Sequence, residues 1–490
     1  MTDAVSAAPQ PLNFRLIALI VASAMFMEQL DATILATALP TMARDFGVLA
    51  PNMSVALTSY LLSLAVFIPA SGRAADKFGA RTVFALAIAV FMLGSALCAQ
   101  APSLPLFVLA RAFQGLGGAM MMPVGRLVLL RAVERKDLVS AMSWVLVPAL
   151  IGPIVGPPIG GFIVTYLDWR WIFYINLPIG LLGLGLVLRF IADTRGEPAG
   201  PFDWSGMALS GVALGCLFFG FELASHPALA PLVVGLLGTG FAFGFLYVRH
   251  ARHTADPIMD LSLMRLPSFG TSVIAGALTR ITQGAQPFLL PLMLQLDFGL
   301  SAAQSGSVVV ATALGSMSMK AFAPRILRRF GFRRTLIVNG VISSCGYACC
   351  AAFRPGLPLS AMFAVLMLCG FFMSFQFTAY NTVAYEAVPA SRMSSATAFY
   401  TTFQQLMLSV GICTAALALE GAMVVDGHVH PLLGDFSAAF LVVAGVSLLS
   451  TVWNLRFAPD AGWEISGHRR RPRQAAAAAF GDGYDRAESA

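Results

Sequence analysis

Residues 27–40 read MEQLDATILATALP and close an apolar run that begins near Phe14. The run is long enough to cross a bilayer, which takes about 20 apolar residues in a helix. Glu28 and Asp31 therefore lie inside a predicted membrane span, where a charge costs about 2.5 to 3.5 kcal/mol near the helix centre. Such residues usually face a bundle interior or a water-filled cavity, so the stretch predicts a polar site among membrane helices.

Glu28 and Asp31 are three positions apart, which puts them on one face of a helix with Cβ atoms about 5 to 6 Å apart. Low polarity and mutual repulsion both favour a protonated, neutral carboxyl group. The pair is therefore a candidate site for binding a proton. The alternative is that both acids are hydrogen-bonded structural residues inside a helix bundle.

The composition indicates a membrane protein with many spans. Of 490 residues, 58% are hydrophobic and 11% are charged, whereas about a quarter of the residues in soluble domains are charged. Apolar runs of about 20 residues predict fourteen membrane helices. Their approximate limits are 15–39, 53–72, 82–100, 104–125, 140–164, 171–191, 205–224, 231–249, 269–294, 302–323, 334–353, 357–380, 394–419 and 436–455.

Basic residues predict the orientation of these spans. With a cytoplasmic N-terminus, 25 of the 31 Lys and Arg residues fall in inside connections and 3 fall in outside ones. This asymmetry places both termini in the cytoplasm, because inside loops of membrane proteins are enriched in basic residues. It also accounts for the net charge of +7, so we expect no nucleic-acid partner.

An internal repeat predicts two related halves. The segment GRAADKFGAR at 72–81 matches PRILRRFGFR at 324–333, each after the second span of its group of six. Two repeats that rock about a central site are the usual architecture for alternating access. The predicted organisation is a six-helix bundle at 1–200, a two-helix insert at 201–255, a six-helix bundle at 256–460 and a disordered cytoplasmic tail at 461–490.

Four motifs together resemble the major facilitator superfamily. They are the loop at 72–81, LARAFQGLGGA at 109–119, GPIVGPPIGG at 152–161 and WRWIFYINLP at 169–178. With the stretch at 27–40, they are similar to its fourteen-span drug:proton antiporter branch, which includes EmrB-like and QacA-like transporters. PVGRL at 123–127 and GSMSMK at 315–320 resemble the MdtD-type multidrug transporters within that branch.

The resemblance implies a fold and an activity. The fold is an all-α integral membrane protein of the major facilitator type, with fourteen helices arranged as 6 + 2 + 6 and two pseudo-symmetric bundles. The activity is proton-coupled export of small amphipathic or cationic compounds by alternating access in a bacterial inner membrane. Asp31, Glu28 and Arg111 would couple transport to protons, with Arg111 as the counter-charge of the acids.

The motifs also assign gating residues. By resemblance, Gly72, Asp76, Gly79 and Arg81 would hold the outward-facing state closed on the inside. Small residues four positions apart let helices approach closely, and prolines bend the backbone. On this ground, together with the resemblance, we expect a hinge or seal between the halves at Gly152, Gly156, Pro157 and Gly160.

Polar residues inside the spans are candidates for substrate binding. They are Glu28, Gln29, Gln114, Arg280, Gln376 and Gln404. Arg280 is the only charge in the body of its span, so an exporter of an organic-acid metabolite or a metal chelate is the alternative. We find no catalytic constellation, metal site or cofactor motif, so we expect no enzyme and a proton gradient as the driving force. The expected partners are a small-molecule substrate, protons and the lipid bilayer, with the chain acting as a monomer or with other envelope components.

Overall fold

The computed structural model describes residues 14–133, 138–192, 202–223, 229–254, 257–389 and 392–463. Within these ranges every regular element is a helix and there is no strand, which confirms the predicted all-helical class. Of the tail predicted to be disordered, residues 464–490 lie outside the described part of the chain.

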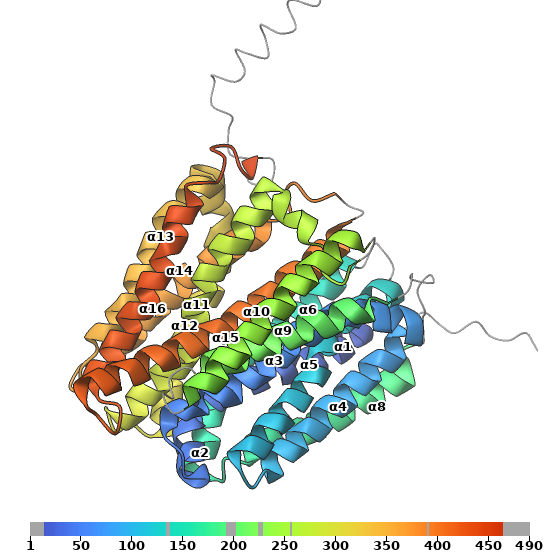
Figure 1. The fold of residues 1–490 in the computed structure, drawn as a ribbon. Coiled ribbons are helices and arrows are strands. Elements are labelled where there is room, and N and C mark those ends of the chain that lie inside the picture. The colour runs from blue at the N-terminus through green and yellow to red at the C-terminus, as the bar shows by residue number, and fades with distance from the viewer. Residues whose placement is uncertain are drawn as a thin grey trace, which may run out of the picture.

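The helices follow one another in three groups along the chain (Figure 1). The first half, as we name residues 14–192, contains α1 (Phe14–Ile34), η1 (Leu35–Thr37), α2 (Leu39–Phe46), η2 (Ala50–Met53), α3 (Ser54–Phe78), α4 (Ala80–Gln100), α5 (Leu104–Ala132), α6 (Leu138–Tyr166), α7 (Trp171–Tyr174) and α8 (Asn176–Phe190). Next come α9 (Trp204–Glu222) and α10 (Ala230–His253). The second half, residues 257–463, contains η5 (Leu261–Arg265), α11 (Pro267–Leu296), α12 (Ala302–Phe330), α13 (Phe332–Ala348), η6 (Cys349–Ala352), α14 (Leu359–Val383), α15 (Met393–Asp426) and α16 (Leu433–Asn454).

The predicted number of fourteen spans is not confirmed. Among the described residues, 12 helices are long and apolar enough to cross a membrane. The predicted spans 140–164 and 269–294 coincide with α6 and α11, which are helices of 29 and 30 residues but are not among the 12. In the part of α6 whose side chains the structure describes, the apolar segment is Ile151–Tyr166, which is shorter than a full span. Helix α11 carries the polar residues Arg280, Gln283 and Gln286 in its body.

Each half packs mainly on itself. In the first half α1 packs on α6 and α5 packs on both α3 and α4, while in the second half α12 packs on α14 and α11 on α15 and α16. The halves meet where α6 packs on α12 and α3 packs on α15. These two seams are therefore the main contacts between the halves.

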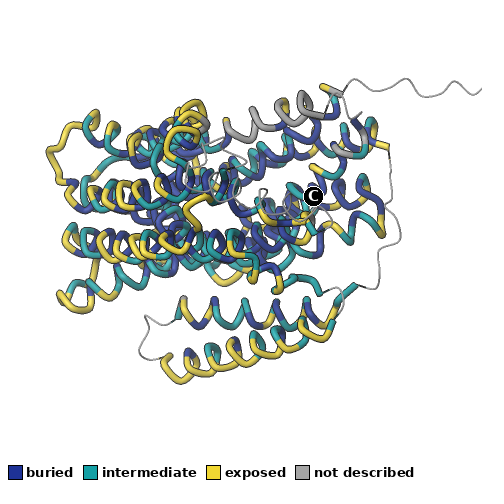
Figure 2. The backbone as a smooth tube through the Cα atoms, turned by 90° about the horizontal axis from the view of Figure 1, so that it is seen from above, coloured by how far each residue is buried: buried dark blue, intermediate teal, exposed yellow. Residues whose placement is uncertain are grey.

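Helices α9 and α10 lie at the edge of the bundle. They pack against each other, and α9 touches the rest of the molecule through α3 and α15. Seen from above, two helices stand apart from the main body with yellow, exposed outer surfaces (Figure 2). Asp203 links both helices to the second half, because its carboxylate bonds His250 Nε2 at 2.7 Å and accepts the Ile258 amide at 3.2 Å.

Glycines of α6 explain its close contact with α1. A Cβ atom at Gly156 would lie 2.1 Å from Thr33 Oγ1, and one at Gly160 would lie 2.5 Å from the Ile34 carbonyl oxygen. Since Cβ atoms do not approach other atoms this closely, only glycine permits this packing. The backbone that carries Glu28 and Asp31 is thereby held against α6.

An adjacent face of α6 forms part of the seam between the halves. A Cβ atom at Gly161 would lie 2.2 Å from the Ala302 carbonyl oxygen. Two hydrogen bonds tie the halves nearby, from Gln295 Nε2 to the Thr37 carbonyl at 3.0 Å and from the Ala303 amide to Thr165 Oγ1 at 3.1 Å. We call this region the α2 end, which lies at the bottom of Figure 1.

Candidate functional site

Asp31 lies at the centre of a buried polar cluster in the first half. Its Oδ2 atom is 2.7 Å from Arg111 Nη1, and both side chains are 1% exposed. Its Oδ1 atom accepts hydrogen bonds from Gln114 Nε2 at 2.9 Å and from Asn176 Nδ2 at 3.0 Å. The structure thus brings Arg111 together with Asp31, one of the two first-span acids.

Arg111 is held in place by several further groups. It donates to Gln114 Oε1 at 2.6 Å and to the Ala56 carbonyl at 3.2 Å. Its guanidinium carbon lies 4.6 Å from the centre of the Tyr60 ring and 5.9 Å from that of Phe173. The first of these ring distances is typical of a cation over an aromatic face. The Asp31 carboxylate thus accepts hydrogen bonds from Arg111, Gln114 and Asn176, the first of which is charge-assisted.

Asn176 is a member of this cluster that the sequence analysis did not single out. Its Nδ2 atom bridges Asp31 Oδ1 and Ser95 Oγ, the latter at 2.9 Å, and Ser95 donates in turn to the Phe173 carbonyl at 2.9 Å. An amide in the first turn of the otherwise apolar α8 is the signal that could have indicated it, because buried amides need partners.

Glu28 lies apart from the ion pair. It is 5% exposed, and its Oε2 atom has no hydrogen-bond partner among the described residues. The same is true of the Tyr60 hydroxyl. Buried polar atoms without partners are uncommon in proteins and often mark a place for a proton, a water or a ligand.

Arg280 forms a second polar site, in the second half. It donates to Gln283 Oε1 at 2.5 Å and to Gln404 Oε1 at 3.1 Å, and its guanidinium carbon lies 3.9 Å from the centre of the Phe377 ring. No carboxylate pairs with it among the described residues, and its Nε atom has no partner there. A small cavity that Tyr380 and Tyr400 also line adjoins this group.

Of the remaining predicted substrate residues, Gln376 and Gln29 lie outside both polar sites, whereas Gln114 and Gln404 belong to them. Gln376 is fully buried in a network of its own, where it accepts from Asn339 Nδ2 at 2.7 Å and donates to the Tyr380 hydroxyl at 2.9 Å. Gln29 packs against α6, where a Cβ atom at Gly152 would lie 2.9 Å from its own Cβ. Gln114 is a partner of Asp31 and Arg111, and Gln404 is a partner of Arg280.

The residues of the predicted gating loop lie at the end of the molecule opposite α2. Asp76 forms an ion pair with Arg131 of α5 at 2.5 Å, and Arg81 donates to the Leu188 carbonyl of α8 at 2.9 Å. Gly79 has a φ of 92°, which L side chains rarely adopt. A Cβ atom added at Gly72 would have no other described atom within 4 Å, so its surroundings would admit a side chain.

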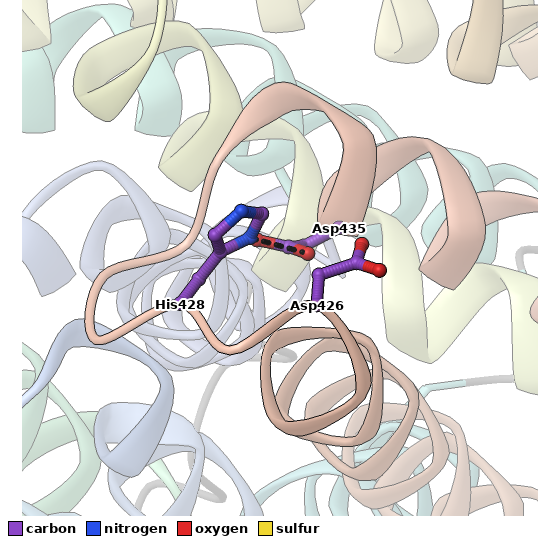
Figure 3. Close-up of side chains that lie close together, drawn as sticks. All are labelled: Asp426, His428 and Asp435. Atoms are coloured by element: carbon purple, nitrogen blue, oxygen red, sulfur yellow. Dashed lines mark hydrogen bonds and ion pairs between the residues drawn. The ribbon is translucent and has the colours of Figure 1, made fainter.

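A cluster of His428, Asp426 and Asp435 lies in the connection between α15 and α16 (Figure 3). Its possible ligand atoms are all within 4.8 Å of one another. Asp435 is fully buried, bonds His428 Nδ1 at 2.9 Å and accepts the Leu432 amide at 2.8 Å. These bonds give Asp435 a structural role, since it caps the first turn of α16.

Comparisons with known proteins agree with this architecture. The family described as Major Facilitator Superfamily matches residues 21–412 and 272–483. The protein named "Putative multidrug resistance protein MdtD" of Salmonella typhimurium is 36% identical over 409 residues, which are 82% of this chain and 85% of that protein. The protein of the same name from Salmonella typhi has the same identity and the same coverage.

Solved structures share the fold at low sequence identity. The transporter PepTSo of the POT family has a TM-score of 0.67 at 14% identity, with 91% of this chain and 98% of that chain covered. A D-xylose-proton symporter has a TM-score of 0.65 at 14% identity, with the same two coverages. The chain is thus a multi-pass membrane transporter rather than an enzyme, and it belongs to the Major Facilitator Superfamily.

Proposed function

We propose that this protein is a proton-coupled secondary exporter of small amphipathic or cationic compounds, which works by alternating access. The single observation that carries the proposal is the buried Asp31 centre, with its ion pair to Arg111 at 2.7 Å. Ionisable groups inside a membrane are costly and usually serve a transport pathway. The names of the relatives, which refer to multidrug resistance, support export of such compounds.

In the proposed cycle Asp31 alternates between two states. In one state, which corresponds to the structure, the Asp31 carboxylate accepts hydrogen bonds from Arg111, Gln114 and Asn176. Protonation cancels the charge that holds Arg111, so the ion pair weakens and α1 and α5 are freer to move apart. A change in the packing of α6 on α1 and α12 then opens the other side, and loss of the proton restores the pair.

Glu28 completes the proposed site. Its unpartnered oxygen can accept a proton or contact the cationic group of a substrate. Proton and substrate would therefore compete for the same acidic region, which produces exchange. We propose that Gly152, Gly156, Pro157 and Gly160 form the moving seam, because α6 contacts both α1 and α12.

We also propose the membrane arrangement. Counting α6 and α11 with the 12 apolar helices gives fourteen spans. The two six-helix bundles would be 1–200 and 256–460, with the insert at 201–255, and a proton gradient would be the only drive. The inner membrane, with both termini in the cytoplasm, then puts the α2 end outside.

Transport by the purified full chain in proteoliposomes tests the function. Efflux of a panel of amphipathic cations is compared with and without a pH gradient. The proposal expects efflux that depends on the gradient and collapses with a protonophore. Transport that is insensitive to both, or no transport of any compound on the panel, would contradict it.

The Arg280 site favours a second candidate, which is export of an organic-acid metabolite or a metal chelate. Its guanidinium has amide and aromatic partners and no carboxylate among the described residues. A carboxylate of the cargo could take that place as a bidentate ligand. Competition of organic acids with cations for binding, in wild type and Arg280→Gln, separates the candidates, because only an anionic cargo should depend on Arg280.

A further inference from the structure

A cavity of about 690 Å³ lies between the halves at the α2 end, well away from Asp31. The first half contributes α2, the segment before η2 and the end of α6, and the second half contributes the α11–α12 and α15–α16 connections. Its volume falls in the range of about 300 to 1,000 Å³ that is typical of sites for small molecules.

The wall of this cavity is apolar on one side. Val48 and Leu49 from the first half face the same space as Leu296 and Leu300 from the second. Such a wall suits the hydrocarbon or aromatic body of a ligand, which gains about 25 cal/mol for each Å² of apolar surface it buries.

Asp297 gives the cavity an acidic group. It follows the last residue of α11, and its Oδ2 atom is buried without a hydrogen-bond partner among the described residues. Burial raises the pKa of Asp297 and the nearby Asp435 carboxylate raises it further, while a hydrogen bond from the Leu433 amide offsets part of this rise. Asp435 itself belongs to the cluster of Figure 3, beside Asp426 and His428.

The charge around Asp297 therefore favours a cation. Three carboxylates, those of Asp297, Asp426 and Asp435, gather at this end of the second half. The wall also carries Arg44, which is exposed and donates to Thr41 Oγ1 at 3.2 Å, and His430. A ligand cation in the cavity would pair with the Asp297 carboxylate, which lines it.

We infer that this cavity is a second ligand site, separate from the Asp31 centre, which binds a small amphipathic organic cation with its charge at Asp297. Both halves form the wall, and hydrogen bonds of Gln295 and Ala303 join the halves beside it. The site therefore exists only while the two halves are in contact at the α2 end, which we call the closed arrangement. A bound ligand therefore stabilises that closed arrangement. This last step rests on the alternating access of the proposed function, whereas the binding itself does not.

Binding of radiolabelled tetraphenylphosphonium to the full chain in nanodiscs tests the site. The background carries Glu28→Gln and Asp31→Asn, so that the central acids no longer attract the probe. We expect Asp297→Asn to weaken binding about tenfold, which corresponds to about 1.4 kcal/mol. Asp168→Asn is the matched control, because Asp168 is an exposed acid that does not line the cavity, and it should bind as the background does.

Leu49→Lys is a second variant of the cavity, which tests the site even if Asp297→Asn does not fold. Leu49 is 40% exposed, so a lysine there is tolerated and places a cation on the apolar wall. It should weaken probe binding as Asp297→Asn does. Binding that is unchanged in both variants would overturn the inference.

A distance measurement tests the conformational part. Spin labels at positions 170 and 357, in exposed connections of the two halves, are read with Cys345 and Cys349 replaced by serine. The probe should increase the population of the short distance, and Asp297→Asn should remove this effect. A distance distribution that the probe does not change, in a protein that binds it, would overturn this part. Failure of the transport assay alone would count against the proposed function and would leave the binding site in place.

Discussion

Arg111, which is fully buried, and Arg280, which is half-buried, lie in opposite halves and have opposite surroundings. Arg111 has a carboxylate partner, Asp31, at 2.7 Å, and both side chains are almost fully buried. Among the described residues, Arg280 contacts the amide oxygens of Gln283 and Gln404 and the ring of Phe377, and no carboxylate pairs with it. The difference shows that similar halves need not share their electrostatics: one arginine is neutralised by the protein, and the other leaves a positive charge for something else to neutralise.

The largest expected effect is on the neutralised side. Asp31→Asn removes the group that we propose to carry the proton, so proton-driven efflux should fall by more than about a hundredfold, the scale of losing an essential proton-transfer group. Efflux from vesicles with matched amounts of protein measures this. Asp168→Asn, an exposed acid in the connection between α6 and α7, is the control and should retain activity.

Loss of transport through misfolding has a separate signature. Asp31→Asn leaves Arg111 as an uncompensated buried charge, which alone costs stability. The double variant Asp31→Asn with Arg111→Gln removes both charges and should recover stability without recovering transport. If the double variant transports as wild type does, Asp31 has no part in the mechanism.

The second prediction compares the arginines directly. Arg111→Gln leaves Asp31 buried and unpaired, and it should lower the free energy of unfolding by about 3 to 5 kcal/mol. Arg280→Gln leaves no orphaned carboxylate among the described residues, so its cost should be below about 1 kcal/mol. Thermal unfolding in detergent measures both. Equal losses in the two variants would mean that Arg280 has a partner equivalent to Asp31.

The third prediction concerns Asn176, which donates to the Asp31 oxygen that Arg111 does not contact. Asn176→Ala removes one donor to the carboxylate, and a hydrogen bond to a charged group is worth about 1.5 to 3 kcal/mol. We expect the free energy of unfolding to fall by that amount. Thermal unfolding in detergent measures this, and Asn176→Asp, which replaces the donor with a second acid beside Asp31, should lower it further. An Asn176→Ala variant as stable as wild type would contradict the prediction.

The fourth prediction tests how α6 positions α1. Gly160→Ala would place a Cβ atom 2.5 Å from the Ile34 carbonyl oxygen, and such overpacking typically costs about 1 to 3 kcal/mol. Gly72→Ala is the control, because no atom of another described segment lies within 4 Å of the position that its Cβ would take. Thermal unfolding should separate the two variants. If both are as stable as wild type, the seam is looser than the described contacts.

The contrast between the arginines also shows what the sequence could predict. Charges in apolar spans must find partners, and this rule, with the resemblance, predicted Arg111 as the counter-charge of the first-span acids without saying that Asp31 rather than Glu28 would contact it. The same rule predicted a partner or a ligand for Arg280 but could not say which, because Gln283 and Gln404 come together only through the packing of α11 on α15. The roles of these residues stay predictions.

Polar residues in apolar helices were harder to place. Gln376 satisfies its amide with Asn339 and Tyr380, and no local pattern relates positions on helices so distant in sequence. Asn176 lies in the motif at 169–178, from which the sequence analysis named no candidate site residue. The number of spans was uncertain for a related reason: the polar groups that give α11 its site also lower its hydropathy.

The smallest expected effect on stability is at a partly exposed ion pair, which can be compared with the buried pair of Asp31 and Arg111. Asp260 and Arg392 pair near the end of the molecule opposite α2, with side chains 25% and 37% exposed. Burial raises the pKa of Asp260, but hydrogen bonds from Ser262 and Arg392 outweigh burial and hold the pKa below its usual value. Because the pKa is lowered, the carboxylate stabilises the folded protein at pH values above the pKa of the unfolded chain, about 3.9. This contribution is lost as the pH falls through the lower pKa of the folded protein.

Asp260→Asn should lower the free energy of unfolding by about 0 to 1 kcal/mol at pH 7, because solvent screens exposed ion pairs. The difference from wild type should shrink below about pH 4. Unfolding measured at both pH values checks this, and a loss as large as that of Arg111→Gln would show that exposure does not separate the two kinds of pair.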